Sequence, residues 1–210
     1  MTDDRHDGLS TTLNKVREAY RLIHAYQRLT IDIMGLIYEE LAKHGASFHR
    51  WAPVLGHYPP RSRFDQPFFA PGNGWAWDLV PGYAWKASFD HATPTHAHRI
   101  IVYIISDTGL EYGTTEPDPE TFEPPERCAS TVWVRVWRSA APGQDWEPAR
   151  RYVNANPGVN DGERHTLTVN GQTMEFQHIT VPLEGLDDGA AVHQLVIQPI
   201  LRWLGGDVAS

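Results

Sequence analysis

Three histidines lie close together in the sequence, at positions where their side chains could hold a metal ion. His91 precedes His96 and His98, which are two residues apart at the expected start of a strand. Alternate residues of a strand point to one face, and neutral imidazoles are common metal ligands. The sequence therefore allows a zinc or manganese site on His96 and His98, with Asp90 or Asp107 as a carboxylate ligand. With 11 histidines in the chain the spacing is weak support, and surface or capping histidines are the alternative.

A metal at these histidines would favour hydrolysis, because a bound metal lowers the pKa of a coordinated water molecule. The sequence gives no other support for an enzyme. It contains no G-x-x-x-x-G-K-[ST] phosphate loop, no G-x-S-x-G nucleophile elbow and no H-E-x-x-H helix. We therefore expect a non-catalytic protein without a cofactor, and we keep a metal-dependent hydrolase as the alternative.

A second group of candidate residues, Trp133, Arg135 and Trp137, lies on one face of a strand predicted over residues 131–139. If that face is open to solvent, an arginine between two indoles forms a platform typical of interface centres. The opposite face is equally apolar and carries Val132, Val134 and Val136. We favour burial of the tryptophans in the core, in which case Arg135 needs a buried carboxylate or carbonyl acceptor.

A third feature is the segment 106–128, which holds most of the net charge of −8. Seven acidic residues and one arginine leave six net negative charges there, and four prolines predict an extended loop. Such a loop could attract a basic protein partner at range. The residues expected to make this contact are Glu116, Asp118, Glu120 and Glu123. A solvated loop without a binding role is the alternative.

These surfaces favour a protein-binding module, such as an adaptor, an inhibitor or an immunity-type protein. A small-ligand binder that uses Trp133, Arg135 and the aromatic and basic coil over residues 48–64 is a further alternative. Outside the acidic segment the chain is nearly neutral. Binding of nucleic acid through a general basic surface is therefore not expected.

The longest structural signal is a helix predicted from Ser10 to His44. Its apolar stripe repeats at alternating intervals of three and four residues. The stripe consists of Leu13, Val16, Tyr20, Ile23, Gln27, Thr30, Met34, Ile37 and Leu41. A second row, Leu22, Tyr26, Leu29, Ile33 and Leu36, widens the apolar surface in the second half. One sheet face does not normally cover so wide an arc, so we expect a homodimer.

The remaining patterns predict strands in antiparallel pairs. We expect a hairpin over residues 75–89 with a loop at 81–83, strands over 99–106 and 131–139, and a hairpin turning at Asn170-Gly171 with a bulge near 177–178. Residues 46–73 and 140–164 read as coil or loop, and residues 187–204 as a helix kinked at Pro199. The predicted fold is an α+β two-layer sandwich, with the long N-terminal helix and the C-terminal helix packed on one face of an antiparallel sheet of about six strands.

The length and composition predict a single domain over residues 1–210, with a flexible N-terminus at 1–9. A single cysteine excludes an internal disulfide framework. The first residues are polar, and the longest purely apolar run has six residues, which is too short to cross a membrane. We expect a cytoplasmic protein.

Overall fold

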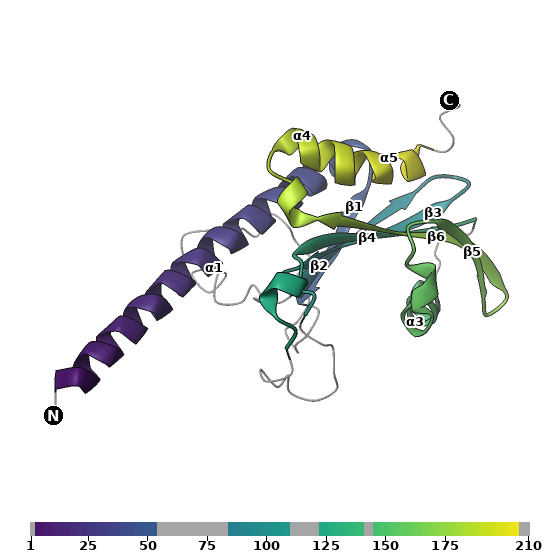
Figure 1. The fold of residues 1–210 in the computed structure, drawn as a ribbon. Coiled ribbons are helices and arrows are strands. Elements are labelled where there is room, and N and C mark those ends of the chain that lie inside the picture. The colour runs from purple at the N-terminus through teal and green to yellow at the C-terminus, as the bar shows by residue number, and fades with distance from the viewer. Residues whose placement is uncertain (1–2, 54–83, 110–121, 141–144, 206–210) are drawn as a thin grey trace.

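The computed structural model describes residues 3–53, 84–109, 122–140 and 145–205. Its centre is a six-stranded antiparallel sheet in the order β1-β2-β3-β4-β6-β5 (Figure 1). The strands are β1 (Ser47–Pro53), β2 (Ala84–Ala92), β3 (Ala97–Ile105), β4 (Thr131–Ser139), β5 (Arg164–Val169) and β6 (Gln172–Pro182). The α-helices are α1 (Asp3–Lys43), α3 (Glu147–Ala155), α4 (Gly189–Val192) and α5 (Gln198–Leu204). Short 3-10 turns are η2 (Pro125–Arg127), η3 (Pro157–Val159) and η4 (Leu183–Gly185), and η5 (His193–Ile197) is a π-helical segment.

The predicted fold class is confirmed. The second half of α1 and the C-terminal helix lie on the same face of the sheet, which we call the helix face (Figure 1). Met34, Ile37 and Leu41 of α1 are fully buried there in one cluster with Val134 of β4 and Trp203 of α5. Burial of each such side chain stabilises the fold by roughly 1.5–3 kcal/mol.

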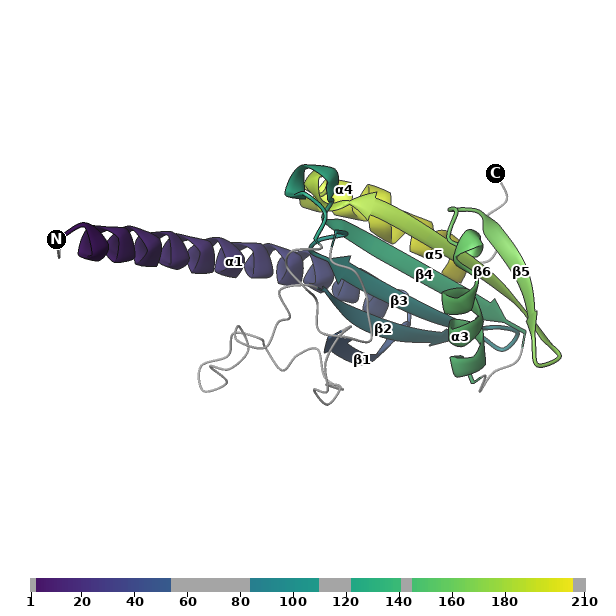
Figure 2. The same ribbon diagram turned by 60° about the horizontal axis from the view of Figure 1, so that its bottom comes forward.

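The opposite face of the sheet, which we call the open face, is partly covered by α3 (Figure 2). Ala149 and Val153 of this helix are fully buried against Trp137 and Phe176 of the sheet. The prediction of a continuous loop over 140–164 is therefore wrong at these residues. Ala149 and Val153 are four residues apart on one helix face, but the helix has only nine residues and lies between turn-forming sequences. That pattern was too short to distinguish from loop.

The first strand of the sheet, β1, was also missed, because residues 46–73 contain five prolines and read as coil. It pairs with β2 from Ser47↔Asp90 to Pro53↔Trp85. Since β2 pairs with β3 along its other edge, the predicted pairing of 75–79 with 85–89 is wrong. Residues 75–79 themselves lie outside the described ranges.

A bulge in β1 lies between Phe48 and Arg50, where the register with β2 shifts. Phe48 and Trp51 both pack in the core on the helix face, although they are three residues apart. An extra residue at His49 makes this possible, because without it their side chains would point to opposite faces. Arg50, paired with Ser88, lines a cavity on the open face.

The predicted hairpin at Asn170-Gly171 is confirmed. Both turn residues have positive φ, 52° and 77°, as a type I′ turn requires, and Leu167 pairs with Met174. The bulge predicted near 177–178 is wrong, because β6 pairs with β4 without a break from Met174 to Pro182. The buried parity of β6 changes for another reason. Phe176 is buried on the open face under α3, whereas Val181 is buried on the helix face.

The C-terminal helix runs from Gly189 to Leu204 and is divided into the three segments α4, η5 and α5. An irregular helix agrees with the kink that the sequence predicts at Pro199. Asp188 caps its start by accepting a hydrogen bond from the Ala191 N–H at 2.7 Å. The π-helical segment lies immediately before Pro199, which lacks the N–H that a regular helix would need. This wider turn lets the helix continue, so that Ile200 and Trp203 still reach the core.

Candidate functional site

The first half of α1 projects beyond the other described elements. The helix begins at Asp3, so the predicted start at Ser10 is wrong; residues 3–9 contain no proline, and their one glycine costs a helix only about 1 kcal/mol. The second half of the helix packs on the sheet. The first half extends away from the six strands and from the helices α3, α4 and α5 (Figures 1 and 2). Residues 9–25 of this helix are all exposed.

The apolar stripe of α1 changes environment along the helix without changing its spacing. Gln27, Thr30 and Met34 are 4%, 1% and 0% exposed, whereas Tyr20 and Ile23 are 68% and 45% exposed. Eight of the eleven large hydrophobic side chains that are exposed among the described residues belong to α1. They are Leu9, Leu13, Val16, Tyr20, Leu22, Ile23, Leu29 and Leu36. We use the name α1 stripe for the five of these residues that continue the buried row: Leu9, Leu13, Val16, Tyr20 and Ile23.

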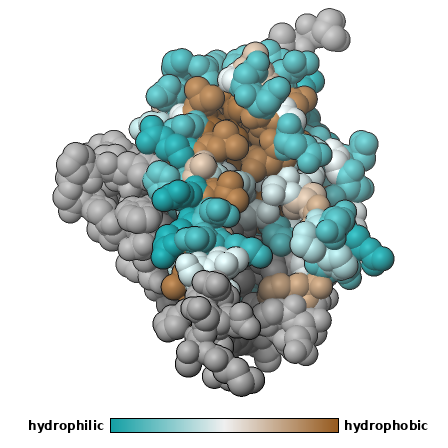
Figure 3. Space-filling model, turned by 60° about the vertical axis from the view of Figure 1, so that its left-hand side comes forward, coloured by the Kyte–Doolittle hydropathy of each residue, from teal (hydrophilic) through white to brown (hydrophobic). Residues whose placement is uncertain are grey.

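Figure 3 brings forward the side from which α1 projects. The largest hydrophobic area in this view lies in its upper half and is bordered by hydrophilic residues, and smaller hydrophobic areas lie below it. Contiguous apolar patches of this kind mark interaction sites in soluble proteins. The second row of α1 also stays uncovered at Leu22, Leu29 and Leu36, which are 71%, 45% and 39% exposed. Wide apolar exposure is therefore a property of the first half of the helix as well as the second.

The strand β4 places Trp133, Arg135 and Trp137 on the open face, and α3 and its neighbours cover most of them. Trp137 is 1% exposed and Arg135 8%, and Trp133 is half-buried. Burial of Trp137 is the core placement that the sequence favoured. A platform open to solvent is therefore wrong for Trp137 and Arg135 in the folded chain. A role of these residues in partner binding stays a prediction, and it would require α3 to move.

Arg135 finds neutral acceptors rather than a carboxylate. Its Nε donates to His178 Nδ1 at 3.2 Å, and a terminal nitrogen donates to Asn154 Oδ1 of α3 at 2.9 Å. Burial, followed by the charge of Arg135, lowers the pKa of His178 to about 4. His178 is therefore neutral at pH 7, with Nδ1 free to accept and Nε2 placed 3.0 Å from the Thr180 hydroxyl. The bond from Arg135 to Asn154 ties α3 to the sheet, and the bond to His178 joins β4 to β6.

The three candidate metal ligands meet at the β2–β3 turn, where His91 pairs with His98. The Nδ1 atoms of His91 and His98 are 3.4 Å apart, and the ring centroids of His96 and His98 are 6.4 Å apart. Burial lowers the pKa of His98 to about 4, with the charge of His91 as the next cause. His96 Nδ1 is engaged with the Thr95 hydroxyl at 2.9 Å. The described residues contain no group of three side chains arranged to hold a metal ion, so the hydrolase alternative gains no third ligand from them.

Of the acidic residues predicted to contact a partner, Glu116, Asp118 and Glu120 lie outside the described residues. Glu123 is described and exposed, and its carboxylate lies 3.8 Å from Arg127, the last residue of the η2 turn. An exposed ion pair at this distance contributes little to stability. The proposed role of this segment in attracting a basic partner stays a prediction.

The comparisons with known proteins assign the chain to a family. A family model described as PM0109 matches residues 6–198. The chain belongs to the PM0109 family. The PM0109 match covers the α1 stripe, the whole sheet and α3, and it ends at the first residue of α5. No curated protein and no solved structure matches the chain.

The described helices were also compared with the length and hydropathy of membrane spans. Although α1 has 41 residues, neither it nor any other helix in the described ranges has an apolar stretch long enough to cross a bilayer.

Proposed function

We propose that the protein is a non-catalytic binding module that pairs with a second copy of itself through the α1 stripe. The observation that carries this proposal is the continuity of the stripe. The same three-and-four spacing that forms the core at Met34 and Ile37 continues through Ile23 to Leu9, where the side chains are exposed. A row of this kind is stable in water only when another apolar surface covers it.

The charges of α1 are compatible with self-pairing. Arg17, Arg21 and Arg28 lie outside the α1 stripe, rotated from its centre by roughly 80–120° around the helix axis, since each residue turns an α-helix by about 100°. Arg28 pairs with Asp32 at 3.3 Å, and Arg17 donates to Asn14. In a helix pair joined along the stripe these cations stay in water, so like charges do not have to be buried.

The size of the contact also fits a second copy. From Leu9 to Ile23 the helix is roughly 21 Å long, which is about four helical turns. Two helices of this length in a side-by-side pair bury several large side chains from each chain. Isolated helices of such length are only marginally stable in water, so pairing would stabilise the projecting half. This surface replaces the acidic segment as the main contact in our proposal, and the acidic segment remains a secondary one.

The test is the mass of the full chain in solution. Light scattering during gel filtration at micromolar concentration should give twice the chain mass of 23.7 kDa. Ile23→Glu places a charge in the proposed contact and should give the mass of one chain, because an unpaired buried charge costs several kcal/mol. Arg21→Glu, a charge change outside the α1 stripe, is the matched control and should stay dimeric.

A wild-type chain that has the mass of a monomer at micromolar concentration would contradict the proposal. So would an Ile23→Glu variant that stays dimeric while its circular dichroism matches the wild type. Because Ile23 lies outside the core of the single chain, this variant should keep its fold, and the two outcomes can be distinguished.

A further inference from the structure

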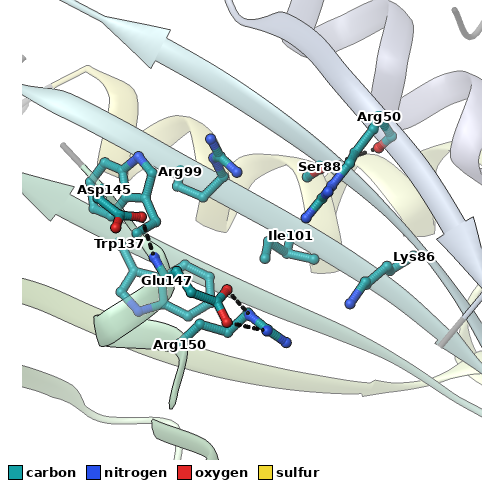
Figure 4. A pocket seen from close by; sticks show the side chains of 10 residues that line it. Arg50, Lys86, Ser88, Arg99, Ile101, Trp137, Asp145, Glu147 and Arg150 are labelled. Carbon is teal, nitrogen blue, oxygen red and sulfur yellow. Dashed lines mark hydrogen bonds and ion pairs between the residues drawn. The ribbon is translucent and has the colours of Figure 1, made fainter. Parts of the chain in front are cut away.

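The open face of the sheet holds a cavity of about 190 Å³ between α3 and the first four strands. Side chains from five consecutive elements line it (Figure 4). They are Arg50 of β1, Lys86 and Ser88 of β2, Arg99 and Ile101 of β3, Trp137 of β4, and Asp145, Trp146, Glu147 and Arg150 at the start of α3. Four cations and two carboxylates give the lining a net charge of about +2.

Two of the four cations already have carboxylate partners. Arg99 donates twice to Asp90, at 2.5 and 3.1 Å, and Arg150 donates twice to Glu147, at 2.9 and 2.7 Å. Two-bond pairs of this kind hold the guanidinium in a fixed orientation. Arg99 and Arg150 therefore form fixed walls of the cavity, and their charges are largely balanced.

The other two cations, Arg50 and Lys86, have no carboxylate partner among the described residues. In Figure 4 both side chains extend over Ile101 into the same space. Arg50 pairs with Ser88, two residues from Lys86 on β2, so the two cations are diagonal neighbours on one face of adjacent strands. Such neighbours have Cα atoms roughly 7–8 Å apart, which lets two long side chains reach a single group.

Lys86 is costly to keep charged in this position. Burial lowers the pKa of its ammonium group to about 8, and the charges of Arg150, Arg50 and Arg135 act in the same direction. Its Nζ lies 5.5 Å from the centroid of Tyr103, which offers a weak attraction rather than a counter-ion. A folded chain that confines three arginines around an unpaired lysine gains stability when an anion enters.

Apart from Ser88 and the charged side chains, the lining is apolar. Ile101, Trp137 and Trp146 contribute the apolar side chains, two of them indole rings. Indoles suit a ring or another flat apolar group. A few charged groups placed on an apolar wall are typical of small-molecule sites.

We propose that this cavity binds a small phosphate monoester whose phosphate lies between Arg50 and Lys86 and whose ring lies against the tryptophans. Two unpaired cations match the two charges of one phosphate group, whereas two separate carboxylates would need cations placed further apart. This site is independent of the α1 stripe, since all of its residues lie on the other side of the sheet from the α1 core.

The test is calorimetric titration of the full chain with phenyl phosphate, inorganic phosphate and phenol. Phenyl phosphate should bind most tightly, inorganic phosphate more weakly and phenol not measurably. Lys86→Gln and Arg50→Gln should each weaken phenyl phosphate binding by about tenfold to a hundredfold, as expected for one hydrogen bond to a charged group. Arg127→Gln, a cation far from the cavity, should leave the affinity unchanged.

A variant that should strengthen binding distinguishes an effect on ligand affinity from an effect on folding stability. Glu147→Gln removes a negative charge from the lining and frees Arg150, so it should strengthen phenyl phosphate binding several-fold even if it weakens α3. The proposal is overturned if phenyl phosphate produces no binding heat, if phenol binds as tightly as phenyl phosphate, or if Glu147→Gln weakens binding while Lys86→Gln does not. Equal affinity for inorganic phosphate and phenyl phosphate would overturn the assignment of the ring.

Discussion

Lowering the pH from 6.5 to 4 is expected to reduce the free energy of unfolding by roughly 3 kcal/mol through two buried histidines. The pKa of His98 and of His178 is lowered to about 4, in each case mainly by burial. Both pKa values lie below the usual 6.5 of an unfolded chain, so the unfolded state binds more protons between pH 4 and 6.5. The contribution of these two neutral histidines to the free energy of unfolding is therefore complete above pH 6.5 and is lost as the pH falls through this window. The figure is about half of the full linkage value, because water and side chains relax around a new charge.

Urea unfolding of the full chain at a series of pH values measures this loss. A double variant, His98→Gln and His178→Gln, should lose much less stability over the same range, since glutamine does not titrate and still accepts a hydrogen bond from Arg135. His24→Gln, on the exposed surface of α1, is the control and should follow the wild type. Some slope should remain in the double variant, because burial also lowers the pKa of His49 and His91. An unchanged slope in the double variant would show that these imidazoles are not the cause.

The substitution of isoleucine by alanine should have different effects at two positions of α1. Ile37 is fully buried and Ile23 is 45% exposed, although both belong to the same apolar row, two heptads apart. Ile37→Ala should lower the free energy of unfolding of a single chain by about 2–5 kcal/mol, because it leaves a cavity between α1 and the sheet. Ile23→Ala should change the stability of a single chain by less than about 0.5 kcal/mol.

The effect on folding and the effect on dimer association need separate measurements. Unfolding of the Ile37→Ala chain is followed by urea titration in the Arg21→Glu and the Ile23→Glu backgrounds, so that dimer and monomer are compared. Ile23→Ala should instead weaken dimer association, as measured by sedimentation at several concentrations. Equal losses of folding stability for the two substitutions would mean that the projecting half of α1 is part of the core after all.

The sequence was sufficient for elements that have a long or unambiguous pattern. The stripe of α1, the Val132-Val134-Val136 face of β4 and the Asn170-Gly171 turn each allow one local structure, and all three are observed. Together they place helices on one face of an antiparallel sheet. Fold class follows from these few patterns because each buries its apolar side against the same layer.

The elements that build the cavity could not be predicted in the same way. β1 contains a bulge that breaks the period of two, and the five prolines of residues 46–73 pointed to coil. α3 is short, so its two buried residues carried no clear periodicity. Without these two elements, nothing in the sequence brings Arg50 and Arg150 near Lys86. The approach of these cations depends on strand order and on a helix returning over the sheet, which are tertiary facts rather than local ones.

The bulge at His49 also bears on how the chain behaves when it is crowded. Among the strands that the structure describes, β1 is one edge of the sheet, and an edge strand offers unpaired N–H and carbonyl groups to a strand of another molecule. The shifted register at His49 and the missing N–H of Pro53 interrupt that row at two places within seven residues. An incoming strand would find only short stretches to pair with. Pairing of sheets through the β1 edge, a step on the route to fibrils, is thereby disfavoured.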